Sequence, residues 1–338
     1  METLVIGIAS LLGLYMAWNI GANDVANSMA DAVGSRALTI GQAVVLAGIC
    51  EFAGAVLVGA PVTDTVRKGI VDPDSFLALS GVSHEQAAAL FIIGMISALM
   101  SAAMWLHISS FLGMPVSTTH SIVGAVAGFG VIAAGWSSVQ WHKMAMIVAS
   151  WFVSPIAGGF MAYVLFKFIN RAILGRGRPT RAAIIYAPYI VSAITATVVL
   201  ATIYKGLRNV IHNINWLTPG VSVLITIVVS ILAGITSRML LRHRLKGKDK
   251  LPVGRQLELV EEVFVPIVII TSCSVAFAHG ANDVANAIGP LAAIVRVVQT
   301  GTVLQKVGGP FLGLGTWRHW DSYRSCYIWL SCDANSRH

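Results

Sequence analysis

Apolar runs separated by short polar breaks follow one another along most of the chain. Most of these runs reach the ~20 residues that an α-helix needs to cross the hydrocarbon core of a bilayer. They lie near residues 3–35, 38–60, 86–106, 114–135, 143–169, 182–204, 216–241 and 262–299. The pattern predicts an all-α integral membrane protein, a helical bundle that crosses the membrane many times.

The first and the last run, 3–35 and 262–299, are too long for one plain span, and polar residues interrupt both of them. Polar backbone at membrane depth is tolerated only inside the protein or against a water-filled cavity. We therefore expect two broken helices, with a functional site at the breaks.

The polar interruption has the same sequence in both runs. Gly-Ala-Asn-Asp-Val-Ala-Asn occupies residues 21–27, here called the first copy, and recurs at residues 280–286, the second copy. Such self-similarity indicates a repeated architecture. About six spans lie between the copies. This even number, added to one full crossing by the first copy, makes the second copy start from the opposite side of the membrane. The sequence thus predicts inverted repeats, a design of secondary transporters in which the site lies where the halves meet.

Each copy carries a carboxylate and amides that suit a cation. Asp24 and Asn27 lie three residues apart and so share one helical face, as do Asp283 and Asn286. Their oxygens are hard ligands for Na⁺, the carboxylates can instead take a proton, and the amides can donate to an anion. The alternative is a polar network that only holds helices together. The candidate cation ligands are Asn23, Asp24, Asn27, Asn282, Asp283 and Asn286.

A second polar segment, Pro115-Val116-Ser117-Thr118-Thr119-His120-Ser121, opens a run rich in small residues. Proline is compatible with the first turn of a helix, and the free N–H groups of a helix start bind anions. The neutral hydroxyls of Ser117, Thr118 and Thr119 add donors, so we expect this segment to bind an anion. Ordinary helix capping is the alternative. His120 either senses pH or bonds a neighbour.

The composition excludes a soluble fold and narrows the function. Of 338 residues, 56% are hydrophobic and only 11% are charged, against about 25% charged in soluble domains. The net charge is +8, and basic clusters at 171–181 and 242–255 are separated by two spans. They should therefore face one side, the cytoplasm. The sequence has no basic face interleaved with aromatic residues, so it does not indicate binding to nucleic acid. The spacing of the cysteines does not match a metal site. No Ser-His-Asp arrangement that would indicate an enzyme is evident.

The two copies together with Pro-Val-Ser-Thr-Thr-His resemble the PiT family of inorganic phosphate transporters over roughly residues 4–308. The resemblance implies about a dozen helices in two inverted repeats, commonly as a homodimer. It also implies symport of phosphate with Na⁺ or H⁺ and no other cofactor. The substrate-binding residues that it implies map onto Asp24, Asn27, Ser117, Thr118, Thr119, Asp283 and Asn286.

The family pattern has a second Pro-x-Ser-Thr-Thr-His element that this sequence lacks, and after Gly308 the residues are no longer membrane-like. We expect a truncated or frameshifted C-terminal end, with a divergent tail as the alternative, and an inactive or unstable product. The expected organisation is a first membrane repeat at 1–170, connecting spans with basic loops at 171–261, the start of the second repeat at 262–308 and an aberrant tail at 309–338.

The sequence thus predicts a multi-pass protein of the cell membrane, not an enzyme, that imports inorganic phosphate by symport with Na⁺ or H⁺. Two unit charges of like sign 4 Å apart repel by about 4 kcal/mol at an effective dielectric of 20, so bound cations would be needed for phosphate to approach two aspartates. Sulfate or another oxyanion is an alternative substrate, and a cation exchanger is an alternative class. The expected partners are phosphate, a monovalent cation, lipid and a second copy of the chain, with no nucleic acid and no metal beyond Na⁺.

Overall fold

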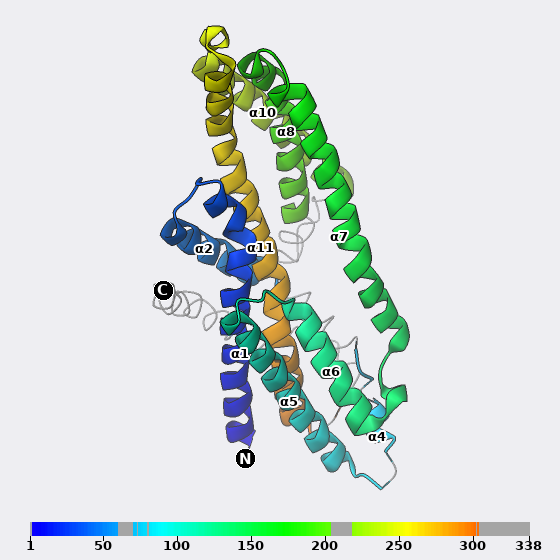
Figure 1. Cartoon of the computed structure of the whole chain (residues 1–338). Coiled ribbons are helices and arrows are strands. Elements are labelled where there is room, and N and C mark those ends of the chain that lie inside the picture. The colour runs from blue at the N-terminus through cyan, green and yellow to red at the C-terminus, as the bar shows by residue number, and fades with distance from the viewer. Residues whose placement is uncertain are drawn as a thin grey trace. The chain divides into compact units, whose positions relative to one another are not determined.

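The computed structural model describes residues 2–59, 70–72, 74–79, 81–203, 218–301 and 303, and most of them are helical (Figure 1). The helices are α1 (Glu2–Gly34), α2 (Ile40–Val58), α4 (Asp74–Leu77), α5 (His84–Phe111), α6 (Thr118–Ala134), α7 (Trp141–Ile169), α8 (Pro179–Ala201), α10 (Pro219–Leu245) and α11 (Val253–Thr300). Short helical turns follow α6, α7 and α10, namely η1 (Trp136–Ser138), η2 (Asn170–Leu174) and η4 (Lys248–Lys250).

Seven helices in this described part are long and apolar enough to cross a membrane. They are α1, α2, α5, α7 with η2, α8, α10 and α11. A helix satisfies its backbone N–H and C=O groups within one segment, which is what the hydrocarbon core requires. The chain is therefore an all-α, multi-pass membrane protein, and the hydropathy pattern predicts this correctly.

The expectation of broken helices is wrong for both copies of the motif. Helix α1 runs unbroken over 33 residues through the first copy, and α11 runs unbroken over 48 residues through the second. Neither copy contains a proline. The polar side chains find partners beside the helix, so the backbone keeps its own hydrogen bonds and no break is needed to satisfy them.

The run at 114–135 also differs from a plain span. Helix α5 ends at Phe111, Gly113 turns the chain with a φ of 68°, and α6 begins only at Thr118. Helix α6 has 17 residues, which at 1.5 Å per residue spans about 26 Å, less than the ~30 Å hydrocarbon core. The residues between α5 and α6 leave the helical path, and they include Pro115 and Val116 of the polar segment.

The described residues form two compact units. The first unit contains the described residues of Met1–Ala30, Ile40–Val148 and Val275–His338, and the second contains Asp31–Thr39 and Ala149–Ser274. Both copies of the motif and the polar segment belong to the first unit. These units do not correspond to the repeats expected from the sequence, and the repeat boundaries stay a prediction.

Two glycines let α2 and α11 approach closely in the first unit. A Cβ added to Gly54 would lie 2.0 Å from the carbonyl oxygen of Phe277, and one added to Gly280 would lie 1.9 Å from that of Glu51. Such distances leave no room for any side chain, which is how small residues bring membrane helices together. The contact places Glu51 of α2 next to the start of the second copy.

Three phenylalanines hold the α5–α6 pair that carries the polar segment. The Phe76 and Phe129 rings stack with centroids 5.3 Å apart, and Phe91 meets the edge of Phe76 at 5.5 Å. A Cβ on Gly94 would lie 1.8 Å from the Phe129 ring. The aromatic contacts thus fix α6 against α5, and with it the start of α6.

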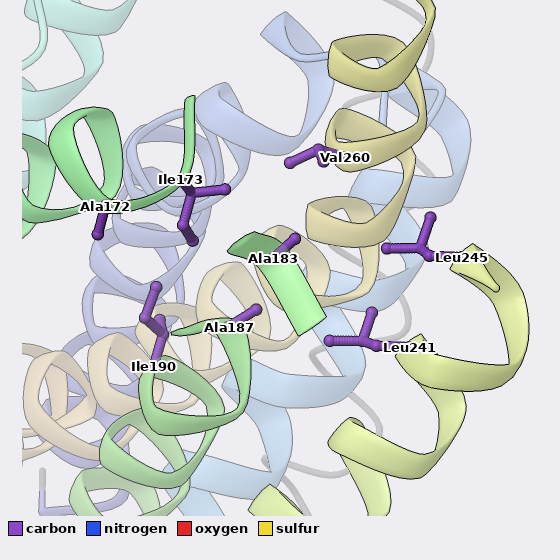
Figure 2. Packing of buried hydrophobic residues seen from close by; sticks show 8 residues of the cluster. All are labelled: Ala172, Ile173, Ala183, Ala187, Ile190, Leu241, Leu245 and Val260. Atoms are coloured by element: carbon purple, nitrogen blue, oxygen red, sulfur yellow. The ribbon is translucent and has the colours of Figure 1, made fainter. Parts of the chain in front are cut away.

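In the second unit, α8 packs against α10 and against the beginning of α11. The buried apolar cluster between them is shown in Figure 2 and consists of Ala172, Ile173, Ala183, Ala187, Ile190, Leu241, Leu245 and Val260. Arg178 of the first basic cluster lies 4.0 Å from Asp249, which is inside the second cluster. The prediction that both basic clusters lie on the same side is therefore confirmed.

The predicted change of character after Gly308 lies outside the described residues. The expectation of a truncated or frameshifted end, and of an inactive product, stays a prediction.

Candidate functional site

The first copy anchors the polar segment through one asparagine. On α1, Asn23 and Asp24 are buried while Asn27 is exposed. The Asn23 amide Nδ2 donates to the carbonyl oxygen of Val116 at 2.7 Å, and the Val116 N–H donates to Asn23 Oδ1 at 3.4 Å. Both ends of the amide thus engage the backbone of one residue, its N–H and its C=O, so Asn23 fixes the chain that leads into Ser117.

Ser117 caps helix α6. Its Oγ accepts the His120 backbone N–H at 3.3 Å, and its backbone is extended, as at a typical helix start. The capping interpretation therefore holds for Ser117. Thr118 and Thr119 follow in the first turn, where the backbone N–H groups have no intrahelical acceptor.

The second copy reaches the same segment through its other asparagine. Asn286 is only 1% exposed. Its Nδ2 lies 3.3 Å from Thr118 Oγ1, 3.1 Å from Thr119 Oγ1 and 3.1 Å from Asp283 Oδ1, and its two N–H hydrogens are shared among these three acceptors. The Thr119 hydroxyl donates to Asp283 Oδ1 at 3.2 Å. Two threonine hydroxyls, an amide and a carboxylate thus form one buried cluster.

The two motif aspartates meet in this cluster. The Asp24 and Asp283 side chains are 5% and 8% exposed respectively, and their carboxyl groups are close enough to interact electrostatically. Two buried carboxylates at such a separation repel strongly unless a proton or a cation lies between them. Asp24 Oδ2 has no hydrogen-bond partner among the described residues, so an acceptor atom remains for that proton or cation.

A third carboxylate, Glu51, was not among the sequence candidates. It lies on α2, interacts electrostatically with both Asp24 and Asp283, and leaves Oε1 without a hydrogen-bond partner in the described part of the chain. Its signal was available, because Glu51 is the only charged residue of the apolar run at 38–60. An ionisable residue inside a span is by default a functional candidate.

The structure does not gather every predicted residue. Asn27 and Asn282 are exposed, and Asn282 reaches only its neighbour Asp283, with Nδ2 3.0 Å from Oδ1. The residues brought together are Asn23, Asp24, Thr118, Thr119, Asp283 and Asn286, with Glu51 beside them.

Hydroxyl groups, a helix start and two carboxylates thus lie together in one buried cluster. A family model described as the phosphate transporter family matches residues 20–322. The chain belongs to this family. The PiT resemblance is thereby confirmed, as is the expectation that the protein is a transporter and not an enzyme.

Individual members of the phosphate transporter family are similar over most of the chain. A protein of Thermococcus kodakarensis that carries the name of a phosphate permease is 42% identical over 303 residues, which are 90% of this chain and 70% of that protein. The chloroplastic inorganic phosphate transporter of Arabidopsis thaliana is 38% identical over 89% of this chain and 52% of its own length. A solved structure, "The sodium-dependent phosphate transporter", superposes with a TM-score of 0.79 at 37% identity and covers 97% of this chain and 76% of the solved one.

Proposed function

We propose that this chain imports inorganic phosphate by symport with a monovalent cation, Na⁺ or H⁺. The observation that carries the proposal is the contact between Thr119 and Asp283, with oxygens 3.2 Å apart. A hydroxyl that serves an anion and a carboxylate that serves a cation are adjacent, so the two ligands would occupy one site.

The coupling follows from electrostatics. Phosphate cannot approach Asp24 and Asp283 while both are charged, because like charges in a region of low dielectric repel strongly. A cation or proton at the aspartates cancels this repulsion. The Asp283 oxygen then no longer needs the Thr119 hydroxyl, which becomes a donor to phosphate. Asn23 keeps the backbone of Val116 in place, so the start of α6 presents its N–H groups to the anion.

Phosphate fits this arrangement better than sulfate does. Near neutral pH phosphate still carries protons on its oxygens, and a carboxylate oxygen is an acceptor for them. Asp24 Oδ2, which lacks a partner among the described residues, provides such an acceptor. Sulfate offers no proton and would leave this oxygen unpaired at a cost.

The test is uptake of radiolabelled phosphate into proteoliposomes that hold the full chain. A Na⁺ or a pH gradient should drive uptake, and unlabelled phosphate should compete better than sulfate. Cation flux that needs no phosphate would instead support an exchanger. Cation-dependent phosphate binding without uptake would agree with the inactive product expected from the sequence and leave the proposed site intact, whereas neither binding nor uptake would contradict the proposal.

A homodimer is part of the same proposal and rests on the family resemblance alone. The molar mass in a detergent micelle, measured by light scattering, tests it.

A further inference from the structure

One end of the second unit carries an excess of positive charge that phosphate transport does not use. Residues 171–181 and 242–262 contain ten basic residues and four acidic ones. We call the basic set the basic surface, and it consists of Arg171, Arg176, Arg178, Arg181, Arg242, Arg244, Lys246, Lys248, Lys250 and Arg255. All but Lys248 are exposed. Within the described residues, ion pairs engage only Arg178, with Asp249, and Arg255, with Glu258.

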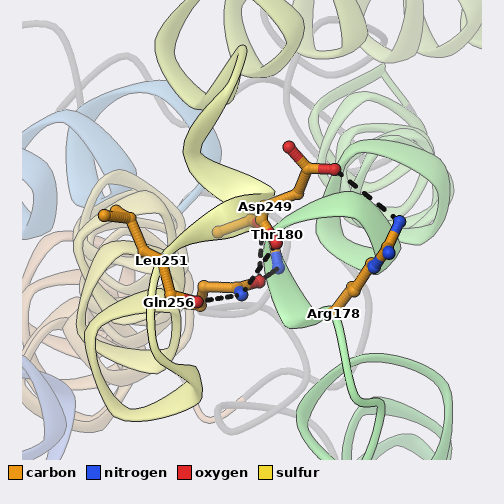
Figure 3. A network of polar contacts seen from close by, with 5 residues as sticks. All are labelled: Arg178, Thr180, Asp249, Leu251 and Gln256. Carbon is orange, nitrogen blue, oxygen red and sulfur yellow. Dashed lines mark hydrogen bonds and ion pairs between the residues drawn. The ribbon is translucent and has the colours of Figure 1, made fainter.

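A buried glutamine holds the backbone of this surface in one arrangement (Figure 3). Gln256 is 2% exposed. Its Oε1 accepts the Thr180 hydroxyl at 2.8 Å, and its Nε2 donates to the carbonyl oxygens of Leu251 at 2.7 Å and Asp249 at 3.1 Å. One side chain thus ties the start of α8, the turn η4 and the start of α11 together.

The apolar cluster of Figure 2 supports the same elements from the membrane side. Ala183 and Ala187 of α8 meet Leu241 and Leu245 of α10 in this cluster, and Val260 of α11 joins them. The backbones that carry the basic side chains are therefore fixed before any ligand binds. Preorganisation of this kind lowers the conformational entropy lost on binding.

Exposed apolar side chains adjoin the basic surface on the same helices. Tyr189 and Ile185 follow the first basic cluster on α8, and Met239 and Leu240 precede the second on α10; all four are exposed. On membrane-spanning helices such faces meet lipid tails, and tyrosine is typical of the interface. The charged groups therefore stand at the depth of lipid headgroups.

We propose that the basic surface binds the phosphodiesters of anionic lipid headgroups. Arginine pairs with phosphate oxygens through two parallel hydrogen bonds, and clusters of four to eight basic residues next to a span are typical of binding to anionic lipid. The basic surface is continuous with the apolar faces of α8 and α10, which favours a lipid over free phosphate. Only a lipid can place a phosphodiester at the basic side chains and an acyl chain against the apolar faces at once.

The test removes charge without disturbing the glutamine contacts. Arg176, Arg181 and Arg244 are exposed and make no ion pair within the described residues. The variant Arg176→Gln, Arg181→Gln, Arg244→Gln removes three charges, and the matched control Arg176→Lys, Arg181→Lys, Arg244→Lys keeps them. The full chain in an uncharged detergent is titrated with short-chain phosphatidylglycerol, phosphatidylcholine or inorganic phosphate, and bound lipid is counted by native mass spectrometry.

Wild type and the lysine control should retain phosphatidylglycerol in preference to phosphatidylcholine, and added salt should weaken this retention. The glutamine variant should lose about fivefold in affinity for each charge removed. Equal retention of the two lipids by wild type would overturn the proposal. Equal behaviour of the glutamine and lysine variants would overturn it too. So would displacement of the lipid by inorganic phosphate at similar concentration, since the surface would then bind any phosphate group. If the glutamine variant does not fold, the lipid preference of the wild type and its dependence on salt still test the proposal.

Discussion

The two copies of Gly-Ala-Asn-Asp-Val-Ala-Asn have the same sequence and share one local contact, yet they use different asparagines in tertiary contacts. In both, the first asparagine donates to the neighbouring aspartate, at 3.2 Å in the first copy and 3.0 Å in the second. The first copy buries its first asparagine, Asn23, and exposes its second, Asn27. The second copy exposes Asn282 and buries Asn286.

Both copies nevertheless act on one segment. Asn23 holds the backbone of Val116, and Asn286 holds the hydroxyls of Thr118 and Thr119. The motif therefore supplies two amides and a carboxylate, and the neighbouring residues determine which of the two amides makes the tertiary hydrogen bonds. Substituting equivalent residues in the two copies should therefore give unequal effects, except at the aspartates.

The aspartates should give the largest effect, and an equal one. Asp24→Asn and Asp283→Asn each remove a charge of the proposed cation site, so each should abolish cation-driven phosphate uptake in proteoliposomes. Asp31→Asn is the matched control, because Asp31 is an exposed aspartate on the same helix α1. Normal uptake by either site variant would show that the copies do not share one site.

The second asparagines should separate the copies most clearly. Asn286→Ala removes an amide that reaches two hydroxyls and a carboxylate and leaves buried acceptors unpaired, a loss of about 1–3 kcal/mol. Phosphate affinity, measured by isothermal titration, should fall about 5- to 150-fold. Asn27→Ala, the same change at an exposed position, should leave affinity within about threefold, or ~0.65 kcal/mol. An equal loss of phosphate affinity in the two variants would mean that Asn27 contributes as much to phosphate binding as Asn286 does.

The hydroxyls come next. Thr118→Val and Thr119→Val keep the side-chain shape but delete the donor, and each should weaken phosphate binding by about 1–3 kcal/mol. Unchanged binding in both variants would leave these threonines with a capping or packing role only.

The first asparagines should differ in the opposite sense. Asn23→Ala releases the Val116 peptide and should lower the maximal rate and the affinity together, because the whole start of α6 loses its anchor. Asn282→Ala removes only a contact with the neighbouring aspartate and should change uptake less. If Asn282→Ala proves the more damaging, the assignment of the anchor to Asn23 is wrong.

The smallest effect is expected at Ser117. Ser117→Ala removes the cap of α6 and should cost about 1 kcal/mol of stability, as for other caps. The thermal midpoint should fall while the preference for phosphate over sulfate stays the same. A lost preference would place the Ser117 hydroxyl on the substrate.

The sequence predicted the membrane class correctly, and it also marked most of the polar residues that the structure brings together; both predictions have a physical reason. Hydropathy reports the energetics of contact with lipid, and a buried aspartate such as Asp283 is costly enough to indicate function on its own. The contacts that depend on tertiary packing could not be predicted from the sequence. The sequence could not show that Asn23 and Asn286, rather than Asn27 and Asn282, would meet the polar segment.

The broken helices and the omission of Glu51 have related causes. A break was expected because polar residues at membrane depth need partners, and here Val116 and Thr119 provide them from the side. Glu51 lies in an apolar run without a motif, so only its charge marks it. Its proximity to the aspartates depends on Gly54 and Gly280, which let α2 and α11 meet.

The most direct test of a shared site is thermodynamic linkage between phosphate and the cation. Phosphate affinity is measured by isothermal titration at low and high Na⁺ and at two pH values, and cation affinity with and without saturating phosphate. A shared site predicts that each ligand raises the affinity of the other by the same factor, that Asp283→Asn removes the effect and that Asp31→Asn keeps it. A phosphate affinity that does not change with either cation would contradict the shared site.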